Sequence, residues 1–83
     1  MKARSRGYTF EDESLKALKV AIKTSIVAGE IGSNIPRMKT IEYSGMSQAN
    51  FYKAMQDPSL FRVGQLYRIY QGLNVPEEAR RYT

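Results

Sequence analysis

The 83-residue sequence predicts an all-α fold, a compact four- to five-helix bundle. In several segments apolar residues recur every three or four positions, which is the pattern of a helix that buries one face. Glycine, proline, serine and asparagine separate those segments, and these residues commonly start or end helices. No segment alternates between apolar and polar residues for long enough to indicate a strand. A chain of this length forms one small domain.

The first predicted helix follows a basic N-terminus. Residues 1–7 carry three basic residues and no apolar anchor, so we expect a flexible basic arm over residues 1–8. Such an arm is either a frayed end or a segment that follows a DNA backbone or minor groove. Thr9 and Asp12 then resemble a capping box, with acidic residues in the first turn where the helix dipole favours them. The predicted helix runs to about Ala28, and Gly29 is its expected C-cap.

The first helix has one apolar stripe that we expect to face the core. The stripe consists of residues at helical spacing: Leu15, Leu18, Ile22 and Ile26. More apolar residues widen this face: Ala17, Val20, Ala21 and Val27. The widened face is one candidate dimer surface, and the C-terminal segment is the other.

A second helix is predicted after the connection formed by residues 29–36. Asn34 and Pro36 indicate a helix start just before residue 37, since asparagine caps helices well and proline is tolerated in the first turn. Residues 37–43 then have helical apolar spacing. The N-terminal end of this helix would offer free backbone amides to an anion such as a phosphate.

A tight turn and a third helix come next. Gly45 can adopt the left-handed conformation that closes a helix, and Ser47 is a good N-cap. Residues 47–57 form the third predicted helix, with Phe51 and Met55 on its apolar face. Its other face carries side chains suited to hydrogen bonding with base edges or phosphates: Gln48, Asn50, Lys53 and Gln56.

A fourth helix is predicted beyond the break at residues 57–59. Its apolar stripe consists of Val63, Leu66, Ile69, Tyr70 and Leu73. Residues 77–83 form a C-terminal tail that contributes one last helical turn or frays. The predicted core consists of Leu15, Leu18, Ile22, Ile26, Ile41, Met46, Phe51, Met55, Phe61, Leu66, Ile69 and Leu73.

The composition excludes several classes of function. The chain contains no cysteine and no histidine, so it has no disulfide framework, no thiolate metal site and no imidazole base. We therefore expect no catalytic activity, no metal, no cofactor and no small-molecule substrate. An enzyme built on carboxylates or lysines is the one catalytic class that the composition leaves open.

The net charge of +5 favours an anionic partner, which is nucleic acid, a membrane surface or an acidic protein. Between Tyr43 and Gln56 the only charged residue is Lys53, so this stretch has no carboxylate that would repel phosphate. No apolar run approaches the roughly 20 residues of a membrane span, and none follows the basic N-terminus as in a secretory signal. We expect a cytoplasmic protein without a membrane partner. A membrane-active helix over residues 10–28 is a minor alternative.

Residues 37–58 resemble the helix-turn-helix of the Cro/repressor family of phage and bacterial DNA-binding proteins. The turn glycine of that family falls on Gly45, and the buried residue that packs the second helix of the motif on its neighbour falls on Phe51. Ile41 stands where the family usually has alanine. Either the two helices lie slightly further apart here, or Thr40 takes that place. The resemblance extends over roughly residues 15–76.

The resemblance implies a lambda-repressor-like DNA-binding domain over residues 9–76, with its recognition helix in a DNA major groove. The residues then expected to contact bases are Ser47, Gln48, Ala49, Tyr52 and Lys53. The residues then expected to contact phosphates are Arg37, Lys39, Asn50, Gln56 and Arg62. Gln48 would be the main reader, because its amide can make two hydrogen bonds to adenine.

The implied role is transcriptional regulation, most often repression, in a phage or mobile element. One module reads too few bases to select a unique site, so we expect a homodimer on double-stranded DNA with a palindromic operator. The alternative from another class is a helical protein–protein interaction module without specific DNA binding. In that case Met46, Tyr52, Tyr67 and Tyr70 would form an exposed patch.

Overall fold

The computed structural model describes the backbone of residues 3–82 and the side chains of residues 13–82. In this part of the chain all regular structure is helical, which confirms the predicted all-α class. The α-helices are α1 (Ala3–Ser33), α2 (Arg37–Ser44), α3 (Gln48–Gln56) and α4 (Val63–Leu73). Two short 3₁₀ turns are η1 (Pro58–Leu60) and η2 (Glu77–Ala79).

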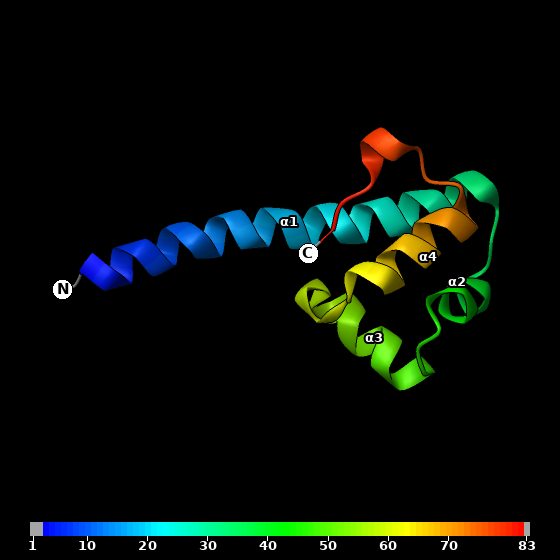
Figure 1. The fold of residues 1–83 in the computed structure, drawn as a ribbon, viewed down its shortest axis with the longest axis horizontal. Helices are drawn as coiled ribbons and strands as arrows, with labels where there is room; N and C mark the ends of the chain where they lie inside the picture. Colours follow the sequence, from blue (N-terminus) through cyan, green and yellow to red (C-terminus); the bar gives the residue numbers. More distant parts are fainter. Residues whose placement is uncertain (1–2, 83) are drawn as a thin grey trace.

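The three shorter α-helices gather beside the C-terminal half of α1 (Figure 1). α4 packs against both α1 and α2, while α3 packs on α2 and η1. The N-terminal half of α1 extends away from the other helices, so the molecule is elongated, with extents of 48 × 27 × 18 Å. The chain after α4 returns along α1, where the Ser25 hydroxyl donates a 2.7 Å hydrogen bond to the Ala79 carbonyl.

α1 is longer at its N-terminus than the sequence predicts. It begins at Ala3, so the backbone of residues 3–8, which lie within the expected flexible arm over residues 1–8, is helical. Met1 and Lys2 lie outside the described residues. Thr9 lies inside the helix instead of capping it. The physical reason is that residues 3–8 contain no proline, and their alanine and two arginines are good helix formers.

The C-terminal end of α1 also differs from the prediction. The helix continues through Gly29 to Ser33, and Asn34 closes it with φ of 55°. The Ile35 N–H then donates to the Glu30 carbonyl at 2.9 Å, as in a Schellman closure. Gly29 is instead a packing residue, because a Cβ there would lie 2.9 Å from a methyl carbon of Val75.

The turn between α2 and α3 follows the prediction. Gly45 has φ of 74° and closes α2, and the Ser47 side chain accepts a 3.2 Å hydrogen bond from the Asn50 N–H. α4 ends in the same way as α1, with Asn74 at φ of 57° and the Val75 N–H donating to the Tyr70 carbonyl. Close packing of α2 on α4 depends on Gly72, where a side chain would collide with the Tyr43 ring.

The core lies between the C-terminal half of α1 and the other helices. Most of the predicted core is buried: Ile22, Ile26, Ile41, Phe51, Met55, Phe61, Leu66, Ile69 and Leu73. Leu18 and Met46 are half-buried at its edge, and Leu15 is 40% exposed. Ala54, Tyr70 and Val75 complete the core, although the predicted core did not include them. Thr40 and Ile41 are both buried, so each contributes to the junction of α2 with its neighbours.

Candidate functional site

The junction of α2 and α3 is held by side-chain hydrogen bonds as well as by Gly45. Ser44 is buried, and its hydroxyl donates to the Ile41 carbonyl at 2.6 Å and accepts from the Met46 N–H at 3.0 Å. The sequence does not reveal this role of Ser44, because serine in a last helical turn has no distinctive pattern. Ser44 and the Ser47 cap together fix where α3 begins.

α3 has two different faces. Phe51, Ala54 and Met55 are buried against the rest of the protein. All of the residues predicted to contact bases are exposed: Ser47, Gln48, Ala49, Tyr52 and Lys53. The helical spacing brings the last four of them to one side, so the N-terminal part of α3 presents an amide, a methyl, a phenol and an ammonium group to solvent.

Four of the residues predicted to contact phosphates are also exposed: Lys39, Asn50, Gln56 and Arg62. The Lys39 ammonium lies 3.2 Å from the Glu42 carboxylate on the same helix. Both side chains of this pair are mostly exposed, so the pair is weak and leaves the ammonium accessible to another anion.

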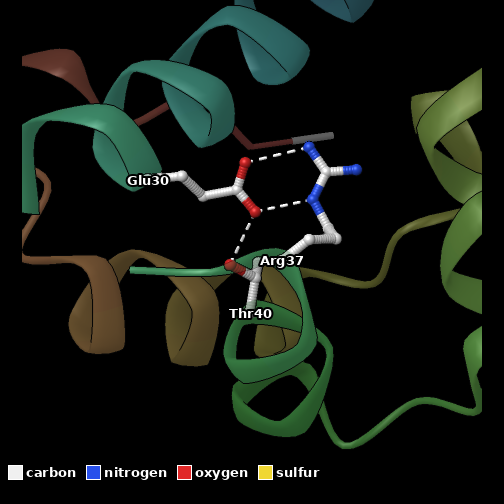
Figure 2. Close-up of polar contacts among 3 residues, drawn as sticks. All are labelled: Glu30, Arg37 and Thr40. Carbon is white, nitrogen blue, oxygen red and sulfur yellow. Dashed lines mark hydrogen bonds and ion pairs between the residues drawn. The ribbon is translucent and has the colours of Figure 1, made fainter. Parts of the chain in front are cut away.

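Arg37 differs from the other four because its guanidinium faces the protein (Figure 2). Its Nε and Nη2 atoms donate to the two carboxylate oxygens of Glu30 at 2.6 and 2.9 Å. The Thr40 hydroxyl donates to the same carboxylate at 2.7 Å. The hydrogen bond with Glu30 raises the pKa of Arg37 above its ordinary value, while partial burial opposes that rise. The three side chains join the end of α1 to the start of α2.

The Arg37 guanidinium also lies near the aromatic rings of α3. Its central carbon is 5.6 Å from the centroid of the Phe51 ring and 6.0 Å from that of Tyr52. These distances are within the range of cation–π attraction. From its place on α2, Arg37 therefore contacts residues of both α1 and α3, which the position of one arginine in a sequence could not reveal.

Arg68 is a further cation at this site that the predicted contact set omits. It is exposed on α4, and its guanidinium lies beside the turn, where a Cβ on Gly45 would be 3.6 Å from Nη2. Within residues 13–82, Lys53, Arg62 and Arg68 have no carboxylate at ion-pair distance, whereas Glu30, Glu42 and Asp57 are each paired. Among the charged side chains of α2, α3, α4 and the segments between them, those without an ion-pair partner are therefore positive.

Asp57 links the end of α3 to α1. Its carboxylate is 2.9 Å from the Lys19 ammonium and accepts a 2.8 Å hydrogen bond from the Ser59 hydroxyl. The Lys19 hydrogen bond and then the Ser59 hydrogen bond hold the pKa of Asp57 below its ordinary value. The carboxylate is thus engaged within the protein instead of adding a free negative charge beside α3.

The described residues contain no cluster of three histidine, cysteine, aspartate or glutamate side chains that could hold a metal ion. In the same part of the chain, no helix is both long enough and apolar enough to cross a membrane. Comparison of the chain with models of protein families, with curated proteins and with solved structures gives no match. Any function must therefore be inferred from the residues and their geometry.

Proposed function

We propose that the protein is a sequence-specific DNA-binding transcriptional regulator of the Cro/repressor type. In this proposal α2 and α3 form a helix-turn-helix, and the exposed face of α3 enters a DNA major groove. The observation that carries the proposal is that face: it joins Gln48, Tyr52 and Lys53 on a short helix that follows a left-handed glycine and a serine cap. A major groove is wide enough to admit an α-helix, and the N-terminal part of the inserted helix contacts base edges.

The charges around α3 support a phosphate backbone as the partner. Lys53, Arg62 and Arg68 have no carboxylate partner within residues 13–82, and the net charge of the chain is +5. Three further polar side chains are exposed and would add contacts to phosphates: Lys39, Asn50 and Gln56. Each lysine or arginine that neutralises a phosphate releases a counterion, so binding should weaken steeply as salt rises.

The proposed active form is a homodimer on a palindromic operator. One α3 reads only a few base pairs, whereas two copies related by a two-fold axis would read half-sites about 34 Å apart. The proposed role is repression in a phage or mobile element, acting in the cytoplasm on double-stranded DNA. Neither the reading of bases nor the contacts to phosphates requires a cofactor.

A protein–protein interaction module is the second candidate function. The exposed patch expected from Met46, Tyr52, Tyr67 and Tyr70 is corrected, because Tyr70 is fully buried and Met46 is half-buried; a different surface favours this function. Three large apolar side chains on η1 and α4 are exposed: Leu60 at 52%, Val63 at 53% and Tyr67, one helical turn after Val63, at 51%. Exposed apolar patches commonly mark protein interfaces. The same patch would also suit the dimer contact of a DNA-binding protein, so a DNA-binding experiment is needed to separate the two functions.

The test is selection of bound sequences from random duplex DNA at moderate and at high salt. We expect enrichment of a palindromic motif with the native chain. The double substitution Gln48→Ala and Lys53→Ala should lower affinity for that motif roughly 30- to 25,000-fold, because two base contacts are lost and each contributes roughly 1–3 kcal/mol.

The matched control is Lys23→Ala, which removes the same net charge from an exposed position on α1. It should retain selection of the motif and helical content. If nothing is enriched and binding disappears at high salt, the proposal is wrong and only the net charge acts. The exposed patch on η1 and α4 would then be tested for a protein partner.

A further inference from the structure

We propose that Arg37 is a positioning residue, which holds α3 and the Tyr52 ring in place, and not a phosphate ligand. The inference rests on the proposed function in one respect, since it takes α3 to be the helix that meets DNA. The sequence predicts a phosphate contact for Arg37 from its place at the start of α2. The contacts of the guanidinium point to a different role (Figure 2).

Removing the Arg37 guanidinium from Glu30 would cost free energy. The Glu30 side chain is 10% exposed, and its carboxylate accepts two hydrogen bonds from Arg37 and one from the buried Thr40 hydroxyl. A buried carboxylate that loses its cation is strongly destabilised, because neither water nor the hydroxyl replaces the lost charge. A DNA phosphate would therefore have to compete with an internal partner that is already desolvated.

The Arg37 guanidinium also contacts α3. Phe51 and Tyr52 are neighbours on α3, and both rings lie within about 6 Å of the guanidinium carbon. Phe51 is fully buried, whereas Tyr52 is 41% exposed on the face proposed to meet DNA. Because α3 itself packs mainly on α2 and η1, Arg37 adds the connection between α3 and the C-terminal end of α1.

The planar shape of the arginine side chain suits this positioning role better than a lysine would. A planar guanidinium can bond both carboxylate oxygens and lie near aromatic rings at the same time. A lysine ammonium has the same charge but no planar fork. Arg37→Lys should therefore lose much of the positioning effect, although a simple phosphate contact would tolerate it better.

The experiment compares Arg37→Gln and Arg37→Lys with Lys39→Gln, which breaks the exposed ion pair on the same helix. Amide hydrogen exchange is measured first, on the free protein. In both Arg37 variants, the α3 amides of residues 53–56 should exchange about ten-fold faster relative to those of Leu66 and Ile69 in α4, since charge-assisted hydrogen bonds are lost. The ring resonances of Tyr52 should shift. Lys39→Gln should leave exchange in α3 unchanged.

The salt dependence of DNA affinity is measured second. Loss of one phosphate contact reduces the slope of log affinity against log salt by about 1. We expect that reduction for Lys39→Gln and an unchanged slope, with weaker specific binding, for Arg37→Gln. Unchanged α3 exchange in the Arg37 variants, or a slope reduced by about 1 in Arg37→Gln, would overturn the inference.

The experiment gives an answer even if Arg37→Gln does not fold or the native chain binds no DNA. If Arg37→Gln does not fold, Arg37→Lys decides the question from its exchange rates alone: faster exchange in α3 supports the positioning role, and native exchange contradicts it. If the native chain binds no DNA, the proposed function fails. The exchange measurements on the free protein still decide whether Arg37 positions α3.

Discussion

The two halves of α1 share one helical backbone but have different surroundings. In the C-terminal half, Ile22 and Ile26 are fully buried, and Gly29 lies in close contact with Leu73 and Val75. At the start of the described side chains, residues 13–17 are all exposed, and the helix there extends beyond the other elements (Figure 1). Helical periodicity thus continues past the part of α1 that has a neighbour to pack against.

The difference shows that an apolar stripe identifies a helix better than it identifies a core. Leu15 lies on the same stripe as Ile22 and Ile26, yet it is 40% exposed whereas the other two are fully buried. A helical segment without tertiary contacts is only marginally stable in water. The tertiary stabilisation of α1 therefore comes from its C-terminal half. Substitutions along α1 should reveal this asymmetry.

The largest expected effect is on the inward stripe. Ile22→Ala should lower the free energy of unfolding by about 2–5 kcal/mol, because it removes a fully buried side chain and leaves a cavity. Leu15→Ala should lower it by less than about 1 kcal/mol, since the side chain is already partly in water. Urea denaturation of the two variants measures both values. Equal losses would contradict the difference between the two halves.

A smaller effect is expected for the glycines of the packed half. Gly29→Ala should cost about 1–3 kcal/mol, because the new methyl group would lie 2.9 Å from a Val75 methyl carbon. Gly32→Ala is the matched control: a Cβ there meets no atom within 4 Å, and alanine favours the helix by roughly 0.5–1 kcal/mol. The two melting temperatures should therefore move in opposite directions. A rise for both would show that α1 and the end of α4 are less closely packed than described.

The smallest expected effect is confined to alkaline pH. Burial raises the pKa of Tyr70 to about 12, and its hydroxyl donates to the Arg81 carbonyl. Below about pH 10 the phenol is protonated in both the folded and the unfolded chain, so its contribution is fully present. Between about pH 10 and 12 only the unfolded chain loses that proton readily, so the free energy of unfolding falls as pH rises.

Tyr70→Phe should make the fall of stability across this pH window shallower. Tyr67→Phe is the control, because Tyr67 is half exposed on the same helix. Denaturant titrations at pH 9, 10 and 11 would measure the slopes of all three proteins. An equal slope for Tyr70→Phe and the native chain would exclude Tyr70 as a source of the alkaline sensitivity.

Much of the fold could be predicted because it depends on local signals. Apolar spacing and the residues around Gly45 and Ser47 predict α2 and α3 with bounds close to those observed, and apolar spacing predicts the existence of α4, although that helix begins at Val63 and not near Ser59 as expected. The ends of α1 could not be predicted in the same way. Gly29 resembles a helix stop in the sequence, and only its contact with the end of α4 shows that it serves close packing. Asn34, which was expected to begin α2, instead ends α1.

The candidate site could be predicted only for its exposed side. The polar face of α3 follows from helical spacing, so Gln48 and Lys53 lie where the sequence indicates. The partner of Arg37 could not be predicted, because Glu30 becomes its neighbour only after the chain reverses between α1 and α2. The position of Arg68 beside Gly45 likewise depends on how α4 packs on α2.

The hydrogen bond between Ser25 and the Ala79 carbonyl joins residues that are 54 positions apart. During synthesis the chain grows from its N-terminus at about 5–20 residues per second. Roughly 3–11 seconds therefore separate the addition of residue 25 from that of residue 79. α1 is therefore complete before η1 and α4, which pack against it, are synthesised. A nascent chain of this protein should therefore expose Ile22 and Ile26 on the ribosome, where a chaperone that recognises apolar helices could bind them.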